Sequence, residues 1–73
     1  MNPWIVADPN ICAGKPTIKG TRIMVKNILG MVAGGYGMDG ILSSYPELKR
    51  EMVQAALEYA AWVIDEEQVV GHS

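Results

Sequence analysis

The chain of 73 residues lacks several features that commonly stabilise small proteins or make them catalytic. It has one cysteine, which excludes an internal disulfide, and one histidine, so the Cys/His spacing typical of a structural metal site is missing. No apolar run approaches the ~20 residues that span a bilayer, and the N-terminus shows neither the charged leader nor the apolar segment of a secretory signal. We therefore expect a cytoplasmic protein without membrane association, metal or other cofactor.

Positive charge is also scarce, and its placement is uneven. Six Lys and Arg residues against eight Asp and Glu residues give a net charge of −2, which by itself disfavours nucleic-acid binding. All six basic residues nevertheless fall between positions 15 and 50: Lys15, Lys19, Arg22, Lys26, Lys49 and Arg50. From position 51 onward there are five acids and no Lys or Arg. This division predicts two faces with different partners, although chance clustering in a small acidic protein explains it equally simply.

Hydrophobic residues make up 49% of a chain that is long enough for one small domain, residues 1–73. Domains below about 70–80 residues have marginal cores and often need a partner. We therefore expect some apolar surface to be buried against another chain, and a homodimer is the simplest arrangement.

The segment 8–25 is dense in residues that fix backbone geometry. Pro9 and Pro16 favour extended conformations in the residues before them, and Gly14 and Gly20 can adopt positive φ without steric cost. Two β-prone runs, 17–19 and 22–25, flank Gly20, which is the pattern of a hairpin. Together with a short strand over 4–7, beside which 11–12 can extend, these runs predict a β-hairpin region over residues 5–25.

Three helical patterns follow the hairpin region. Apolar residues at i, i+3, i+4 and i+7 spacing predict helices over 25–33, 38–45 and about 49–66, so residues 25–67 form a three-helix bundle. Gly34 and Gly35 end the first helix, and Gly37 is a poor N-cap for the second. Residues 68–73 are expected to be a flexible tail.

A resemblance adds to these patterns. The residues that carry it are Asp8-Pro9, Ile11-Cys12, Gly14-Lys15-Pro16, Ile18, Gly20-Thr21-Arg22-Ile23 and, more weakly, Ile28-Leu29, Gly35, Ile41-Leu42, Tyr45-Pro46, Leu48 and Ala55 to Ala60. In these positions the chain resembles the small bacterial family called Domain of Unknown Function 433. The resemblance implies a mostly α fold, in which a short strand and hairpin precede a three-helix helix-turn-helix-like bundle of homeodomain-like or winged-helix-like form. It also implies an antitoxin-like role beside nuclease toxins of the PIN-like class.

The sequence offers no convincing catalytic constellation. Gly14-Lys15 does not match a phosphate-binding loop, because Pro9 and Pro16 stand where that motif needs Gly and Ser or Thr. Cys12 has no nearby base to activate it, since the one histidine is His72, and cysteine is among the most often buried residue types. We therefore expect Cys12 to be a small core residue and the protein not to be an enzyme.

The second and third predicted helices have helix-turn-helix form, in which the start of the second motif helix enters the major groove of DNA. That start carries Lys49, Arg50 and Gln54, and Arg and Gln pair with guanine and adenine edges respectively. Arg22 and Lys26, on and after the hairpin, are candidate phosphate contacts. The alternative is a bundle whose charged face is solvated and whose hairpin cations only prevent edge-to-edge aggregation.

The C-terminal part of the chain is the candidate partner-binding region. Trp62 lies three residues after Tyr59, on the same helix surface, and either anchors a partner or packs in the core, where we expect Tyr59. The acids that follow oppose the helix dipole, so the predicted partner-binding residues are Trp62, Asp65, Glu66, Glu67, Val69 and Val70.

Two functions fit these observations. The first is an antitoxin-like regulator that binds operator DNA and a PIN-like nuclease toxin, with the basic and acidic parts of the chain serving the two tasks. The alternative is a protein–protein interaction module without nucleic-acid binding, which the net charge of −2 favours.

Overall fold

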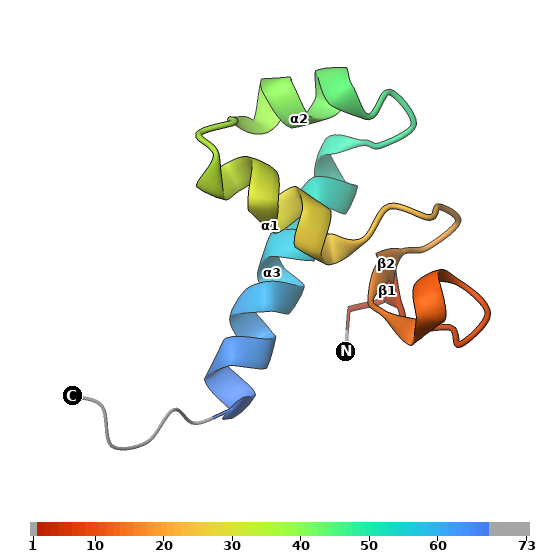
Figure 1. The fold of residues 1–73 in the computed structure, drawn as a ribbon. Helices are drawn as coiled ribbons and strands as arrows, with labels where there is room; N and C mark the ends of the chain where they lie inside the picture. The colour runs from red at the N-terminus through yellow and green to blue at the C-terminus, as the bar shows by residue number, and fades with distance from the viewer. Residues whose placement is uncertain (1, 68–73) are drawn as a thin grey trace.

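The computed structural model describes residues 2–67 and shows a mostly helical protein. A two-stranded antiparallel sheet is followed by three helices (Figure 1). The strands are β1 (Ile5–Val6) and β2 (Thr17–Ile18), and the helices are α1 (Val25–Ala33), α2 (Met38–Ser44) and α3 (Arg50–Glu67). The predicted fold class, a short strand pair before a three-helix bundle, is confirmed.

The strands pair differently from the sequence prediction. β2 takes β1 as its partner, with Ile5 opposite Ile18 and Val6 opposite Thr17. The run 22–25, predicted as the second arm of a hairpin, contributes only an isolated bridge between Thr17 and Met24. The physical reason is that α1 begins at Val25, so the arm ends before a second strand can form.

The turn itself is where the sequence placed it. The Thr21 amide donates to the Ile18 carbonyl across 2.9 Å, and Gly20 has φ +81°, the third position of a type II turn. The Thr21 hydroxyl also donates to the Ile18 carbonyl (2.8 Å) and accepts from the Ile23 amide (3.0 Å). Positive φ at Gly20, expected from the sequence, is confirmed.

Between the strands the chain makes a tight turn, where two predictions are wrong. Residues Cys12–Gly14 form a short 3-10 turn rather than an extension of the first strand. Cys12 and Ala13 have φ of 52° and 57°, so this turn runs through the left-handed region. Cys12 is half-buried instead of a core residue, because that turn directs its thiol to the Arg22 carbonyl (3.6 Å) at the edge of the fold.

The predicted first helix has the same bounds as α1. The hydrogen bonds that follow Ala33 explain why the helix ends there. The Gly35 amide donates to the Val32 carbonyl and the Tyr36 amide to the Met31 carbonyl, at 3.0 and 2.9 Å. This is the Schellman arrangement, which places Gly35 at φ +95°. The glycine therefore both ends α1 and turns the chain toward α2.

Helices α2 and α3 are joined by residues 45–49 and form the predicted helix-turn-helix order. Gly37 is the N-cap of α2 and makes no side-chain capping bond, as the sequence indicated. Leu48, only 5% exposed, fixes the turn by packing into the core. The first residues of α3 are thereby held beside α2 (Figure 1).

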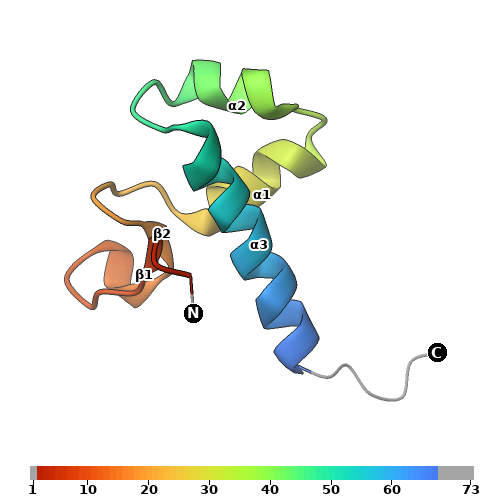
Figure 2. The same cartoon turned by 180° about the vertical axis from the view of Figure 1, so that it is seen from behind.

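The core is formed by side chains from the sheet and all three helices. Its buried members are Ile5, Ile18, Ile23, Val25, Ile28, Ile41, Leu48, Val53 and Ala56. The fully buried residues of α3 lie in its N-terminal half, and the C-terminal end of the helix extends away from the bundle in both views (Figures 1 and 2). No helix in residues 2–67 has the length and hydrophobicity needed to cross a membrane.

Candidate functional site

The first turn of α3 presents the basic residues predicted to contact DNA. Lys49 immediately precedes α3, and both it and Arg50 are exposed. Arg50 lies 3.6 Å from the Asp39 carboxylate on α2, and the two side chains are 63% and 98% exposed. An exposed pair of this kind contributes little to stability, so Asp39 does not prevent Arg50 from taking another partner.

The exposed charged residues that follow Arg50 on α3 are acidic. Gln54, the predicted adenine contact, is exposed and lies with Glu51 and Glu58 along one cleft. Residues three and four apart share a helix surface, so Glu51 and Glu58 lie one turn before and one turn after Gln54. The basic surface is therefore restricted to the first turn of the helix.

The two predicted phosphate contacts lie elsewhere. Arg22 and Lys26 are both exposed, Arg22 after the Gly20 turn and Lys26 in the first turn of α1. Lys26 lines a groove with Val63 and Ile64 of α3, and Ile64 is about 20 Å along the helix from Arg50 at ~1.5 Å per residue. Lys26 is thus separated from Lys49 and Arg50, and the predicted basic residues do not form one cluster.

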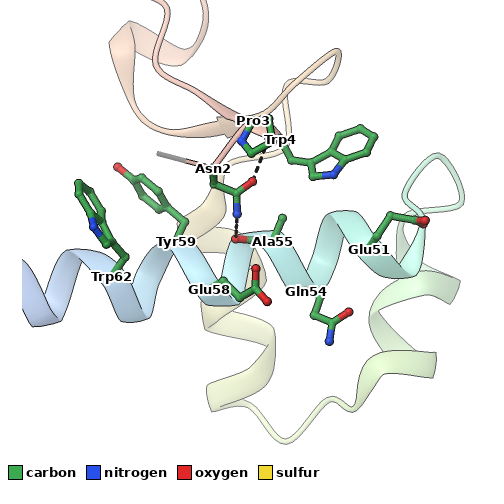
Figure 3. A pocket seen from close by; sticks show the side chains of 9 residues that line it. All are labelled: Asn2, Pro3, Trp4, Glu51, Gln54, Ala55, Glu58, Tyr59 and Trp62. Atoms are coloured by element: carbon green, nitrogen blue, oxygen red, sulfur yellow. Dashed lines mark hydrogen bonds between the residues drawn. The ribbon is translucent and has the colours of Figure 1, made fainter.

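A cleft lies between α3 and the N-terminal segment (Figure 3). Its volume is about 500 Å³, and it is lined by Asn2, Pro3, Trp4, Glu51, Gln54, Ala55, Glu58, Tyr59 and Trp62. Asn2 forms the wall: its amide Nδ2 donates to the Ala55 carbonyl and its Oδ1 accepts from the Trp4 amide, both at 2.9 Å. The cleft therefore combines a fixed wall, three aromatic rings and two carboxylates.

At one end of this cleft Trp62 packs against Tyr59 (Figure 3). The ring centroids are 6.2 Å apart with an interplanar angle of 36°. Tyr59 is partly buried against the core, as expected, whereas Trp62 is 48% exposed and is therefore not a core residue. A half-exposed Trp held by a ring partner is typical of a protein interface.

The other predicted partner-binding residues lie in the last turn of α3 and in the residues that follow it. Asp65 is exposed on this helix. Glu66 and Glu67 complete α3, and Val69 and Val70, with the rest of the predicted tail over 68–73, lie outside the described residues. The acidic segment is thus helical at least through Glu67.

Sequence reasoning missed six of the nine residues that line the cleft, among them Asn2, Trp4 and Glu58. Glu58 could have been found, because it lies four residues before Trp62 and shares its helix face. Asn2 and Trp4 could not, because the hydrogen bond that joins this segment to α3, from Asn2 to Ala55, links residues 53 positions apart. Within residues 2–67 no three His, Cys, Asp or Glu side chains gather as metal ligands.

Comparison with known proteins identifies relatives whose function is not described. The family model for "Protein of unknown function (DUF433)" matches residues 5–60 of the chain. The uncharacterized protein y4eO of Sinorhizobium fredii (strain NBRC 101917 / NGR234) is 32% identical over 56 residues, which are 77% of this chain and 25% of y4eO. The chain therefore spans about a quarter of this curated relative.

A solved structure supports the fold. The crystal structure of a DUF433 member protein from Anabaena variabilis ATCC 29413, at 2.00 Å resolution, superposes with a TM-score of 0.79 at 30% sequence identity. The match covers 90% of this chain and 64% of the Anabaena chain. The hairpin and three-helix arrangement is thus shared with that protein.

Proposed function

The chain belongs to the DUF433 family, and on this premise we propose that it is an antitoxin-like cytoplasmic regulator, which binds operator DNA and pairs with a PIN-like nuclease toxin. Lys49 and Arg50 contact DNA, and the surface around Trp62 contacts the toxin. The two tasks fall on different parts of α3, which lets one chain hold both partners.

The observation that carries the DNA part is the position of Lys49 and Arg50. Helix-turn-helix proteins place the first turn of the second motif helix in the major groove, and in this chain that turn follows α2 and exposes both cations. Arg50 reads a base and Lys49 contacts a phosphate in this arrangement. The neighbouring Glu51 and Glu58 restrict the contact to this turn, so we expect modest affinity that depends strongly on salt.

A binding titration with the DNA upstream of the protein's own gene tests this function. We expect a shift at low salt that Arg50→Ala weakens by about 1–3 kcal/mol if Arg50 reads a base. Lys19→Ala is the matched control, because Lys19 is an exposed cation outside the predicted site. No binding at low salt, or equal losses for the two variants, would exclude this DNA site.

The toxin part rests on Trp62 and the cleft beside it. Exposed aromatic residues dominate interface energetics, and the cleft carboxylates on Glu51 and Glu58 suit a basic segment, which binds both carboxylates and aromatic faces. Co-purification with a PIN-like nuclease encoded beside the gene, and inhibition of that nuclease, test the pairing.

The second candidate is an interaction module that does not bind nucleic acid. The flanking of Gln54 by Glu51 and Glu58 favours it, because both carboxylates repel phosphates on the face that would enter the groove. A chain that captures its protein partner but fails to bind DNA at any salt concentration would establish this candidate in place of the first.

A further inference from the structure

The cleft between α3 and the N-terminal segment carries negative charge without a compensating cation. Glu51 and Glu58 are its charged residues, and both are exposed. The nine residues that line the cleft include no Lys or Arg. Within residues 2–67 the ion pair of the structure joins Arg50 to Asp39 and involves neither glutamate. Both carboxylates are therefore available to a cation from solution.

Aromatic rings accompany the two carboxylates and divide the cleft into two halves. Trp4 lies toward Glu51, whereas Tyr59 and Trp62 lie beyond Glu58 at the other end (Figure 3). An ammonium group binds to the face of an aromatic ring as well as to a carboxylate. Each half of the cleft thus combines one carboxylate with at least one ring, which is the chemistry of a site for an ammonium group.

Helix geometry sets the distance between the two halves. Glu51 and Glu58 are seven residues apart on α3, so they share a face of the helix, and their Cα atoms are about 10.5 Å apart along its axis at ~1.5 Å per residue. Ala55, whose side chain is a single methyl group, lines the cleft between them. A ligand that reaches both carboxylates therefore needs two cationic groups at roughly this separation, joined by a chain that crosses Ala55.

We propose that the cleft binds a linear polyamine, an aliphatic chain with an ammonium group at each end. An extended chain advances roughly 3.5 Å for every three bonds, so terminal nitrogens about nine bonds apart, as in spermidine, span about 10 Å. One terminal ammonium then lies on Glu51 and Trp4, and the other on Glu58 and Trp62. The cleft volume of about 500 Å³ lies in the range of small-molecule sites.

The wall of the cleft is fixed within the chain, which favours a small ligand. The Asn2 side chain donates to the Ala55 carbonyl at 2.9 Å and so holds the N-terminal segment on α3. A wall that is already fixed loses little freedom when a ligand binds. The proposal rests on neither DNA binding nor toxin pairing. A basic segment of a toxin would use the same carboxylates, so bound polyamine would compete with it.

Titration of the full chain with spermidine at low salt, followed by tryptophan fluorescence, tests the proposal. The chain has two tryptophans, Trp4 and Trp62, and both line the cleft, so the emission reports on this site. We expect saturable binding at millimolar or lower concentration. Putrescine, whose shorter chain does not span both halves, should bind about threefold more weakly, because one exposed ion pair is lost.

Two variants test the two halves separately. Glu51→Gln and Glu58→Gln should each weaken spermidine binding about threefold, the usual size of one exposed ion pair. Both side chains are exposed, so the variants should fold, and circular dichroism checks that they do. Glu47→Gln is the matched control, because Glu47 is an exposed acid that does not line the cleft, and it should leave spermidine binding unchanged.

Three results would overturn the proposal: no fluorescence change at any spermidine concentration, equal affinity for putrescine and spermidine, or equal losses for Glu47→Gln and the two cleft variants. Capture of a PIN-like toxin is measured separately. A chain that captures the toxin but does not bind spermidine overturns this proposal and leaves the proposed function intact. A chain that binds spermidine with the expected dependence on both glutamates but captures no toxin does the reverse.

Discussion

The side-chain amide of Asn2 donates a hydrogen bond to the backbone carbonyl of Ala55, 2.9 Å away and 53 residues later in the chain. A helical carbonyl has two lone pairs, so Ala55 can accept this bond in addition to its bond within α3. The Asn2 Oδ1 also accepts from the Trp4 amide at 2.9 Å. One side chain thereby joins the N-terminal segment to the middle of the longest helix and positions the wall of the cleft.

Loss of the Asn2 side chain should loosen this connection. We expect Asn2→Ala to lower the free energy of unfolding by about 1–2 kcal/mol, because two part-buried hydrogen bonds of ~1 kcal/mol each are lost and partly replaced by water. Urea denaturation measures the change. Asn10→Ala is the control, since Asn10 is exposed. Equal stability of both variants would show that the Asn2 contact contributes nothing.

Two glycines should respond to alanine in opposite directions. Gly20 has φ +81° and open space where an added methyl group would lie, so Gly20→Ala carries backbone strain alone, about 1–2 kcal/mol for an L-residue in the left-handed region. Gly30 lies within α1 with nothing nearby, so Gly30→Ala should stabilise by about 0.5–1 kcal/mol. Thermal unfolding of both variants checks the signs, and a melting temperature unchanged by Gly20→Ala would contradict the turn geometry.

The acid beside Arg50 should limit DNA binding. Glu51→Gln removes a negative charge and leaves the shape of the side chain nearly unchanged. If the first turn of α3 contacts phosphates, the affinity of the protein for DNA should rise. The expected increase is about twofold for each phosphate that lies roughly 8 Å from the removed charge in water. Salt titration of binding measures this effect.

Asp65→Asn is the control for Glu51→Gln, because Asp65 lies 15 residues after Arg50 on α3, about 22 Å along the helix at ~1.5 Å per residue. This separation exceeds the Debye length of about 8 Å at physiological salt. Equal effects of the two variants would point to a general effect of net charge instead of a local site.

Removing Trp62 should separate partner binding from folding. Trp62→Ala should weaken binding of a PIN-like toxin at least tenfold, because the half-exposed ring is the largest apolar group at the cleft end. Loss of the Tyr59 contact costs about 0.5–1.5 kcal/mol of stability. Tyr36→Ala is the control, since Tyr36 is a 51% exposed aromatic residue on a different segment.

A chain ending at Ile64 extends this test to the acidic segment. We expect it to remain folded, because the buried core lies before this point, and to lose toxin capture through the missing Asp65, Glu66 and Glu67. Toxin binding at full affinity by both Trp62→Ala and the shortened chain would place the interface elsewhere.

The helices could be located from the sequence because their determinants are local. The apolar spacing over 25–33 and the glycines after it give the same bounds as α1, and the third predicted helix differs from α3 by one residue at each end. The Gly20 turn was found for the same reason, since one residue in positive φ is enough to define it.

The partner of β2 and the burial of Cys12 could not be predicted from local sequence patterns. β2 selects β1, 11–13 residues away, over the nearer run 22–25, because pairing depends on where α1 begins and on which edge the core leaves open. Cys12 was expected in the core because of its residue type, but the left-handed turn at Cys12 and Ala13 places it at the edge.

The sequence by itself therefore determined the mostly helical fold, the three helices and the Gly20 turn, because periodicity, glycine and proline act within a few residues of chain. The family was identified separately, from the motifs that the chain shares with it. Only the tertiary structure decided that Asn2 and Trp4 line a cleft with α3, that Trp62 is exposed, and that Lys26 lines a groove with the C-terminal half of α3. These relationships join segments distant in sequence. They follow from how the helices pack and from how far α3 extends beyond the core, which no local pattern specifies.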